Sequence, residues 1–131
     1  MHKLAVAVAV LITLTGCSKF NLEEATIVAY NVSSSPVEFY VNDGAPHGVA
    51  ANGTVKFTVQ IEVATRPVTS TSPSYTVDKV VQVSVAAKNL ATGKLTRPQL
   101  CSAGAKVITH VSYEMYAGGY DYVRCDATYP Y

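Results

Sequence analysis

The sequence predicts an all-β protein, an antiparallel β-sandwich of about seven strands. Two observations carry this prediction. After residue 24, apolar residues recur at every second position, in segments rich in Val, Thr and Tyr. Gly, Pro, Asn and Ser interrupt these segments at hairpin-like spacings, and no segment has the periodicity of a long helix. Sandwiches of immunoglobulin or transthyretin type combine these features, and a small barrel is the alternative.

Three strands are expected in the first half of the domain. Residues 26–32 form the first, which ends at a Ser-Ser-Ser-Pro turn, and residues 37–41 form the second. Asn42-Asp43-Gly44 then turns the chain, because Asn and Gly tolerate positive φ. Residues 55–63 alternate most regularly, which predicts a half-buried strand. Its apolar face comprises Val55, Phe57, Val59, Ile61 and Val63.

A loop rich in Thr, Ser and Pro, residues 64–74, leads to the second half and is expected to be the most mobile segment. Ser102-Ala103-Gly104 is interpreted as a turn, and Gly118-Gly119 as another. The four strands expected around these turns are residues 75–87, 94–101, 106–116 and 120–126.

The first sixteen residues have the features of a signal peptide. A basic start that includes Lys3 precedes an apolar run, Leu4–Leu14, in which Thr13 is the only polar residue. The run is too short to span a bilayer, which needs about 20 residues. Its length suits the apolar core of a signal peptide.

The four residues Leu14-Thr15-Gly16-Cys17 resemble the lipobox of bacterial lipoproteins. This resemblance implies that signal peptidase II cleaves before Cys17 and that lipids, such as palmitate, are attached to this cysteine. Ser18 is not aspartate, which in Gram-negative lipoproteins usually permits export to the outer membrane. The alternatives are an ordinary signal peptide with a chance cysteine, or a short buried strand.

Three parts follow from this resemblance. Residues 1–16 are expected to be the lipoprotein signal peptide, residues 17–24 the lipidated cysteine with a short tether, and residues 25–131 the β-sandwich domain. The seven-residue tether after Cys17 spans at most about 25 Å, so the domain is expected to work close to the membrane. Two or three acyl chains anchor a protein stably, whereas one chain binds only marginally.

Cys101 and Cys125 remain as a pair in a chain that is expected to be exported, and a structural disulfide between them is therefore predicted. The bond closes a loop of about 25 residues, which stabilises the fold by roughly 3–4 kcal/mol on the chain-entropy model. It also favours an oxidising periplasm as the compartment.

The balance of charge excludes one class of partner. The chain has ten Lys and Arg, one of them Lys3 in the leader, and nine Asp and Glu, so the mature part is formally neutral. A nucleic-acid-binding protein would carry a basic stripe, and none is present.

The residues that could carry catalysis do not form a recognisable set. After processing only His47 and His110 remain as histidines, and both are interpreted as surface residues, His110 on the outer face of a strand. A zinc site needs three or four ligands, so no metal or cofactor is expected. Glu23 and Glu24 fall in the tether, and no G-x-S-x-G nucleophile motif exists. The protein is therefore not expected to be an enzyme.

Tyrosine is concentrated near the C-terminus, where six of the nine tyrosines lie. If Cys125 points toward the core, Tyr120, Tyr122 and Arg124 share the exposed face of the last strand. Exposed Tyr with Arg is typical of protein interfaces, whereas cross-strand aromatic pairs can simply stabilise a hairpin. The candidate binding surface comprises Tyr116, Tyr120, Tyr122, Arg124, Tyr129 and Tyr131.

These observations favour a non-catalytic envelope lipoprotein that docks a protein partner, such as a secretion or conjugation apparatus or another outer-membrane assembly. The expected location is the outer membrane, facing the periplasm. One alternative is a module that binds glycan or peptidoglycan through the same tyrosines. Another is an inhibitor of a secreted enzyme such as lysozyme, which would use the loop at residues 64–74. Residues 30–53 also loosely resemble the opening of small envelope β-sandwich domains, at the stretch PVEFYVND, and this implies no activity.

Overall fold

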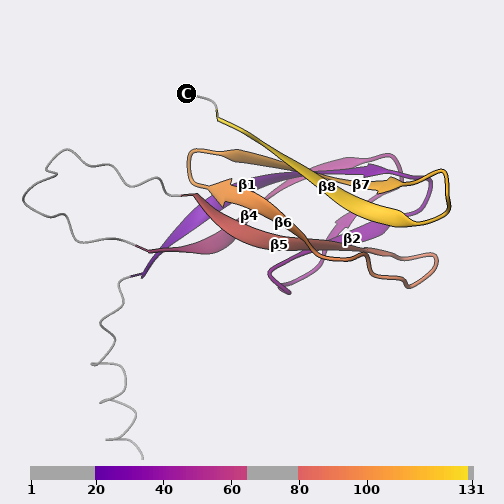
Figure 1. Cartoon of the computed structure of the whole chain (residues 1–131), viewed down its shortest axis with the longest axis horizontal. Coiled ribbons are helices and arrows are strands. Elements are labelled where there is room, and N and C mark those ends of the chain that lie inside the picture. Colours follow the sequence, from indigo (N-terminus) through magenta and orange to yellow (C-terminus); the bar gives the residue numbers. More distant parts are fainter. Residues whose placement is uncertain (1–19, 65–79, 130–131) are drawn as a thin grey trace, which may run out of the picture.

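The computed structural model describes residues 20–64 and 80–129, which form two four-stranded sheets packed face to face (Figure 1). These two sheets confirm the predicted all-β sandwich, with eight strands instead of about seven. No helix in these two segments is long and apolar enough to cross a membrane. The strands are β1 (Phe20–Val32), β2 (Val37–Val41), β3 (His47–Val49), β4 (Thr54–Ala64), β5 (Val80–Asn89), β6 (Gln99–Gly104), β7 (Ile108–Met115) and β8 (Asp121–Thr128).

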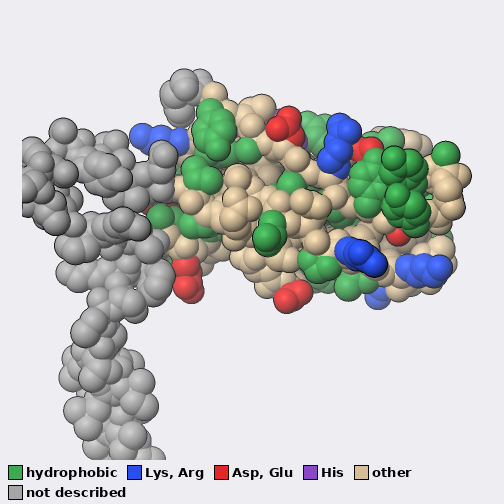
Figure 2. All heavy atoms as spheres, in the orientation of Figure 1, with side chains coloured by type: hydrophobic (Ala, Val, Ile, Leu, Met, Phe, Trp, Pro, Cys, Tyr) green, Lys and Arg blue, Asp and Glu red, His purple; other side chains and the backbone are tan. Residues whose placement is uncertain are grey.

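The first sheet has the strand order β4-β1-β7-β8 and the second has the order β3-β2-β5-β6. β1 pairs with β4 antiparallel and with β7 parallel, and every other pair is antiparallel. In immunoglobulin domains the first strand instead pairs with the second. Of the two sandwich types that the sequence suggested, the order of these strands therefore favours the transthyretin type. Lys and Arg occur together with Asp and Glu on the face drawn in Figure 2.

β1 begins at Phe20, six residues before the predicted start of the first strand. Residues 20–24, expected to belong to the tether, pair with residues 60–64 of β4. The sequence predicts a solvated tether for this segment because it contains two adjacent acidic residues, Glu23 and Glu24. A long neighbour overrides that local preference, since β4 offers backbone partners along its whole length.

Two further elements differ from the sequence-based expectation. β3 is an additional strand of only three residues, which follows Pro46 and is held by pairing with β2. β6 covers residues 99–104 rather than 94–101, so Ser102-Ala103-Gly104 is strand and not a turn. Ala103 is fully buried opposite Val81, and these contacts continue the strand past the predicted turn. The predicted loop at residues 64–74 lies outside the described residues, apart from Ala64.

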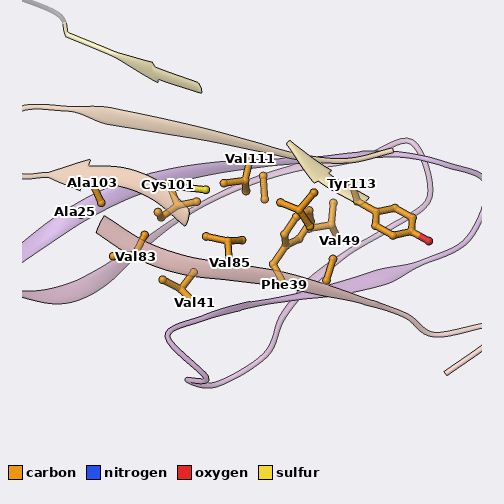
Figure 3. Close-up of a cluster of buried hydrophobic side chains, with 14 of the residues drawn as sticks. Ala25, Phe39, Val41, Val49, Val83, Val85, Cys101, Ala103, Val111 and Tyr113 are labelled. Carbon is orange, nitrogen blue, oxygen red and sulfur yellow. The ribbon is translucent and has the colours of Figure 1, made fainter. Parts of the chain in front are cut away.

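The core lies between the sheets and is built from the inward faces of both. Figure 3 shows Phe39, Val85 and Val111 directed into this layer, and all three are fully buried. The predicted apolar face of β4 is confirmed: its members at the Ala64 end are buried and those at the Thr54 end are half-buried against the core. The outward residues of β4 are exposed, as a strand with one wet face requires.

The two sheets are linked at both edges of the sandwich. On one side, Cys101 of β6 and Cys125 of β8 form the predicted disulfide, with their Cα atoms 5.8 Å apart. On the other side, the His47 ring of β3 stacks on Phe57 of β4 with ring centroids 3.7 Å apart. His47, expected in a surface loop, is thus a strand residue, and its burial lowers the pKa of its imidazole.

One end of the sandwich, which we call the distal end, holds a set of buried polar contacts. β1 ends there and the β7–β8 turn lies there, while Phe20 lies about 40 Å away at the proximal end (Figure 1). The Asn31 side chain is 2% exposed and donates hydrogen bonds to the carbonyl oxygens of Ser35, Val49 and Ala50. These bonds satisfy a buried donor and link the end of β1 to the β1–β2 turn and to the β3–β4 turn.

Removal of the disulfide is expected to destabilise the protein without changing its fold. The Cys101→Ala/Cys125→Ala variant should lose about 3–4 kcal/mol of unfolding free energy, because its unfolded chain gains the freedom of a 25-residue loop. Urea unfolding of the oxidised wild type, the reduced wild type and the variant measures this loss. The reduced wild type is the control, and equal midpoints for all three proteins would contradict the prediction.

Candidate functional site

The β7–β8 hairpin closes through a tight turn at the distal end. The backbone N–H of Tyr116 donates to the carbonyl oxygen of Tyr120 at 2.7 Å. The backbone N–H of Gly119 donates to the carbonyl oxygen of Tyr116 at 2.9 Å. Gly119 has a φ of 97°, which favours glycine at this position. The turn therefore places Tyr116 and Tyr120 directly across from each other.

Three tyrosine rings gather on the outer face of this hairpin. The Tyr116 centroid lies 5.0 Å from that of Tyr120 and 5.6 Å from that of Tyr122, distances typical of attractive aromatic pairs. Tyr116 and Tyr120 are nevertheless 55% and 60% exposed. Figure 2 shows hydrophobic side chains gathered over this turn, with Lys or Arg beside them. We call Tyr116, Tyr120, Tyr122, Glu114 and Arg124 the tyrosine hairpin.

Glu114 of β7 organises the polar side of the tyrosine hairpin. Its carboxylate accepts hydrogen bonds from Ser112 Oγ at 2.7 Å and from Tyr122 Oη at 2.8 Å. Arg124 Nε lies 3.7 Å from the same carboxylate. The bond from Ser112, then that from Tyr122, and then the nearby Arg124 charge lower the pKa of Glu114.

The same hydrogen bond raises the pKa of Tyr122, because the phenol donates to a carboxylate that would repel a phenolate. Tyr122 is thus held as a neutral donor in a fixed position, with its ring against Tyr116. Arg124 has only a long contact to Glu114, and its side chain is 72% exposed. The arrangement offers aromatic faces and one accessible guanidinium group.

Four of the six predicted surface residues come together in the tyrosine hairpin, namely Tyr116, Tyr120, Tyr122 and Arg124. Tyr129 is also exposed but follows β8 at its other end, about 25 Å away along the strand. Tyr131 lies outside the described residues. The predicted orientation of β8 is correct: Val123 is buried, Cys125 faces β6, and Arg124 is exposed.

Glu114 is the central residue that sequence reasoning missed. The signal was its place opposite Tyr122 in the hairpin, but that register depends on the length of the turn. β8 continues two residues beyond the predicted end of the last strand, and residues 126–128 pair with β7. Tyr113 belongs to the core and not to the surface.

His110 lies on the outer face of β7, as predicted. Its Nδ1 lies 3.1 Å from Tyr30 Oη and its Nε2 lies 3.1 Å from Thr128 Oγ1, so both ring nitrogens have polar neighbours on adjacent strands. Within residues 20–64 and 80–129, no three His, Cys, Asp or Glu side chains are close enough to share a metal ion.

An open depression of about 430 Å³ lies on the outer face of the second sheet. Its lining includes Tyr40, Asp43, Lys88 and Leu95. The Tyr40 hydroxyl donates to Glu38, which raises the pKa of Tyr40. The depression is shallow, and none of the predicted surface residues contributes to it.

The fold and the tyrosine hairpin define a small disulfide-linked β-sandwich that displays an aromatic surface at one end. Comparisons with protein-family models, with curated proteins and with solved structures find no match to this chain. Its function is therefore argued from its own residues.

Protonation of Glu114 is expected to destabilise the protein in acid. The pKa of Glu114 in the folded protein is lowered from its ordinary value of 4.5. The ionised carboxylate therefore contributes its full share of the unfolding free energy above pH 4.5. This contribution is lost as the pH falls through the pKa of the folded protein. Below about pH 4.5 the unfolding free energy should therefore decline more steeply for the wild type than for Glu114→Gln. Chemical unfolding at a series of pH values measures both slopes. Glu24→Gln, at an exposed site on β1, is the matched control and should keep the wild-type slope.

Proposed function

We propose that this protein is a lipid-anchored, non-catalytic envelope lipoprotein that docks a protein partner through the tyrosine hairpin. The partner belongs to a secretion or conjugation apparatus or to another outer-membrane assembly. The observation that carries the proposal is the exposed, internally braced tyrosine cluster at the distal end. Large, accessible aromatic side chains beside an Arg are the residues that most often dominate protein–protein binding.

The geometry of the cluster supports recognition of a protein surface. Glu114 fixes Tyr122, and Tyr122 in turn supports the ring of Tyr116. Binding therefore costs little conformational entropy, since these side chains are already ordered before a partner arrives. Tyr phenols and the Arg124 guanidinium supply hydrogen bonds at the rim of the apolar area, the common pattern of such interfaces.

The position of the cluster fits attachment through Cys17. In the sequence only Ser18 and Lys19 separate that cysteine from Phe20, so at most about 11 Å of chain links the lipid to the start of β1. The tyrosine hairpin lies at the opposite end of the sandwich (Figure 1). The lipid anchor and a docked partner therefore do not compete for the same part of the surface.

Glycan binding by the same rings is the second candidate, because exposed Tyr116 and Tyr120 could stack on the apolar faces of sugars. Inhibition of a secreted enzyme has less support. The ends of the segment between residues 64 and 80 lie at the proximal end, beside Phe20 and Gly104. An inhibitory loop would thus start next to the proposed anchor.

Loss of Tyr116 and Tyr120 is expected to abolish docking. The Tyr116→Ala/Tyr120→Ala variant should retain its stability, because both side chains are more than half exposed, and lose at least about tenfold in affinity. Affinity pull-down from cross-linked envelopes, followed by titration of the captured partner, measures this loss. Tyr129→Ala is the matched control, since Tyr129 is 61% exposed at the other end of β8.

Three outcomes separate the candidates. A defined protein captured by wild type and by Tyr129→Ala, and lost with the double variant, supports docking. Capture of peptidoglycan alone would support the glycan-binding candidate instead. Equal capture by all three proteins would assign the rings to the stability of the hairpin and reject both functions for this surface.

A further inference from the structure

The outer edge of β4 is long, and no strand of residues 20–64 and 80–129 pairs with it. β4 has eleven residues and lies at the edge of the first sheet. It contains no Pro, and every one of its residues pairs with β1 in continuous register. An edge of this kind is a template for pairing with another strand.

The backbone groups of this edge can be assigned from one hydrogen bond. The N–H of Asn31 donates to the carbonyl oxygen of Gly53 at 2.9 Å, at the point where the β1–β4 ladder begins. In an antiparallel ladder, alternate residues direct both backbone groups toward the neighbour. The odd-numbered residues of β4 therefore bond to β1, and the even-numbered residues direct their N–H and C=O groups outward.

We propose that β4 pairs antiparallel with β4 of a second copy of this chain, about a two-fold axis at Val59. Val59 is the midpoint of Thr54–Ala64, so all eleven residues of each strand find a partner in this register. The four-stranded sheets that contain β4 in the two copies then join into one sheet of eight strands. This dimerisation is independent of the docking function proposed for the tyrosine hairpin.

Charge complementarity singles out the second copy as the occupant. In the register centred on Val59, Lys56 of each chain lies opposite Glu62 of the other, on the exposed face of the joined sheet. Because the axis is two-fold, the dimer contains two such Lys56–Glu62 pairs. A register centred one residue away in either direction places Lys56 opposite Gln60 or Ala64 and loses both ion pairs. Opposite charges at directly paired positions favour one register over its neighbours.

The apolar face of the edge fits the same register. Phe57 and Val55 are only half-buried within one chain, whereas Ile61 and Val63 are 2% exposed. Pairing about Val59 places Phe57 opposite Ile61 and Val55 opposite Val63 of the second copy. The half-exposed side chains of each chain are thus covered by the well-packed end of the other, which completes both ends of the core.

The symmetry has a consequence for orientation. The two β1 strands run in opposite directions, so the two Phe20 residues lie at opposite ends of the dimer and each end carries one tyrosine hairpin. In the proposed lipoprotein, the anchor of one copy then lies at the same end as the tyrosine hairpin of the other copy, and β1 of that other copy and both β4 strands separate the two.

A cysteine at the axis tests the proposal directly in the full-length protein. Val59 would face its own copy in a non-hydrogen-bonded pair with Cα atoms about 4.5 Å apart, a distance that a disulfide spans. Val59→Cys in purified, detergent-solubilised protein should form a covalent dimer under mild oxidation. Thr54→Cys is the control, because its two copies would be ten residues out of register, about 33 Å apart. Linkage of Val59→Cys no greater than that of Thr54→Cys overturns the proposal.

A charge exchange supplies the second test. Lys56→Glu or Glu62→Lys alone should weaken self-association roughly tenfold, because each change places like charges opposite each other twice. The Lys56→Glu/Glu62→Lys variant should regain the wild-type affinity. Sedimentation of the four proteins in detergent measures the affinities. Single variants that associate as the wild type does, or a double variant that stays monomeric while folded by circular dichroism, overturn the proposed register.

Discussion

The fold depends on the pairing of β1 with two neighbours. Its antiparallel pairing with β4 covers residues 20–30 and its parallel pairing with β7 covers residues 26–32, so β1 spans the whole length of the sandwich. The parallel pair decides where the tyrosine hairpin lies. Because β7 runs in the same direction as β1, the turn that follows β7 lies where β1 ends. An antiparallel neighbour would have brought that turn beside Phe20, next to the proposed anchor.

Buried polar contacts make the distal end a firm support for the hairpin. The Tyr113 hydroxyl accepts a hydrogen bond from Asn89 Nδ2 at 3.0 Å and donates one to Asp121 Oδ2, so it joins the end of β5 to the start of β8. Burial of this side chain and its bond to Asp121 raise the pKa of Tyr113. Burying such groups is costly unless they are satisfied, and here each has its partner. The exposed rings of the tyrosine hairpin are thus attached to a part of the fold that is fixed by satisfied hydrogen bonds.

Sequence reasoning recovered the features that depend on local pattern and missed those that depend on neighbours. The alternation in β4 identified its buried face, because one wet side imposes a period of two. β3 escaped detection because three residues carry no period, and the start of β1 was hidden by Glu23 and Glu24. Tyr116, Tyr120 and Tyr122 could be grouped from their spacing around Gly118-Gly119. The role of Glu114 could not, because it rests on a cross-strand register, and Tyr129 was included because closeness in sequence does not reveal the length of β8.

The cystine between β6 and β8 constrains how the molecule can mature. Cys101 and Cys125 are 24 residues apart in sequence and lie in strands that do not pair with each other, so the bond can form only after β6 and β8 have both been made and brought together. Three cysteines allow three different pairings, and Cys17 is the one competitor for either core thiol. In the proposed lipoprotein, the thioether on Cys17 keeps that sulfur from forming a disulfide. Of the three pairings that these cysteines allow, only the one between β6 and β8 then remains.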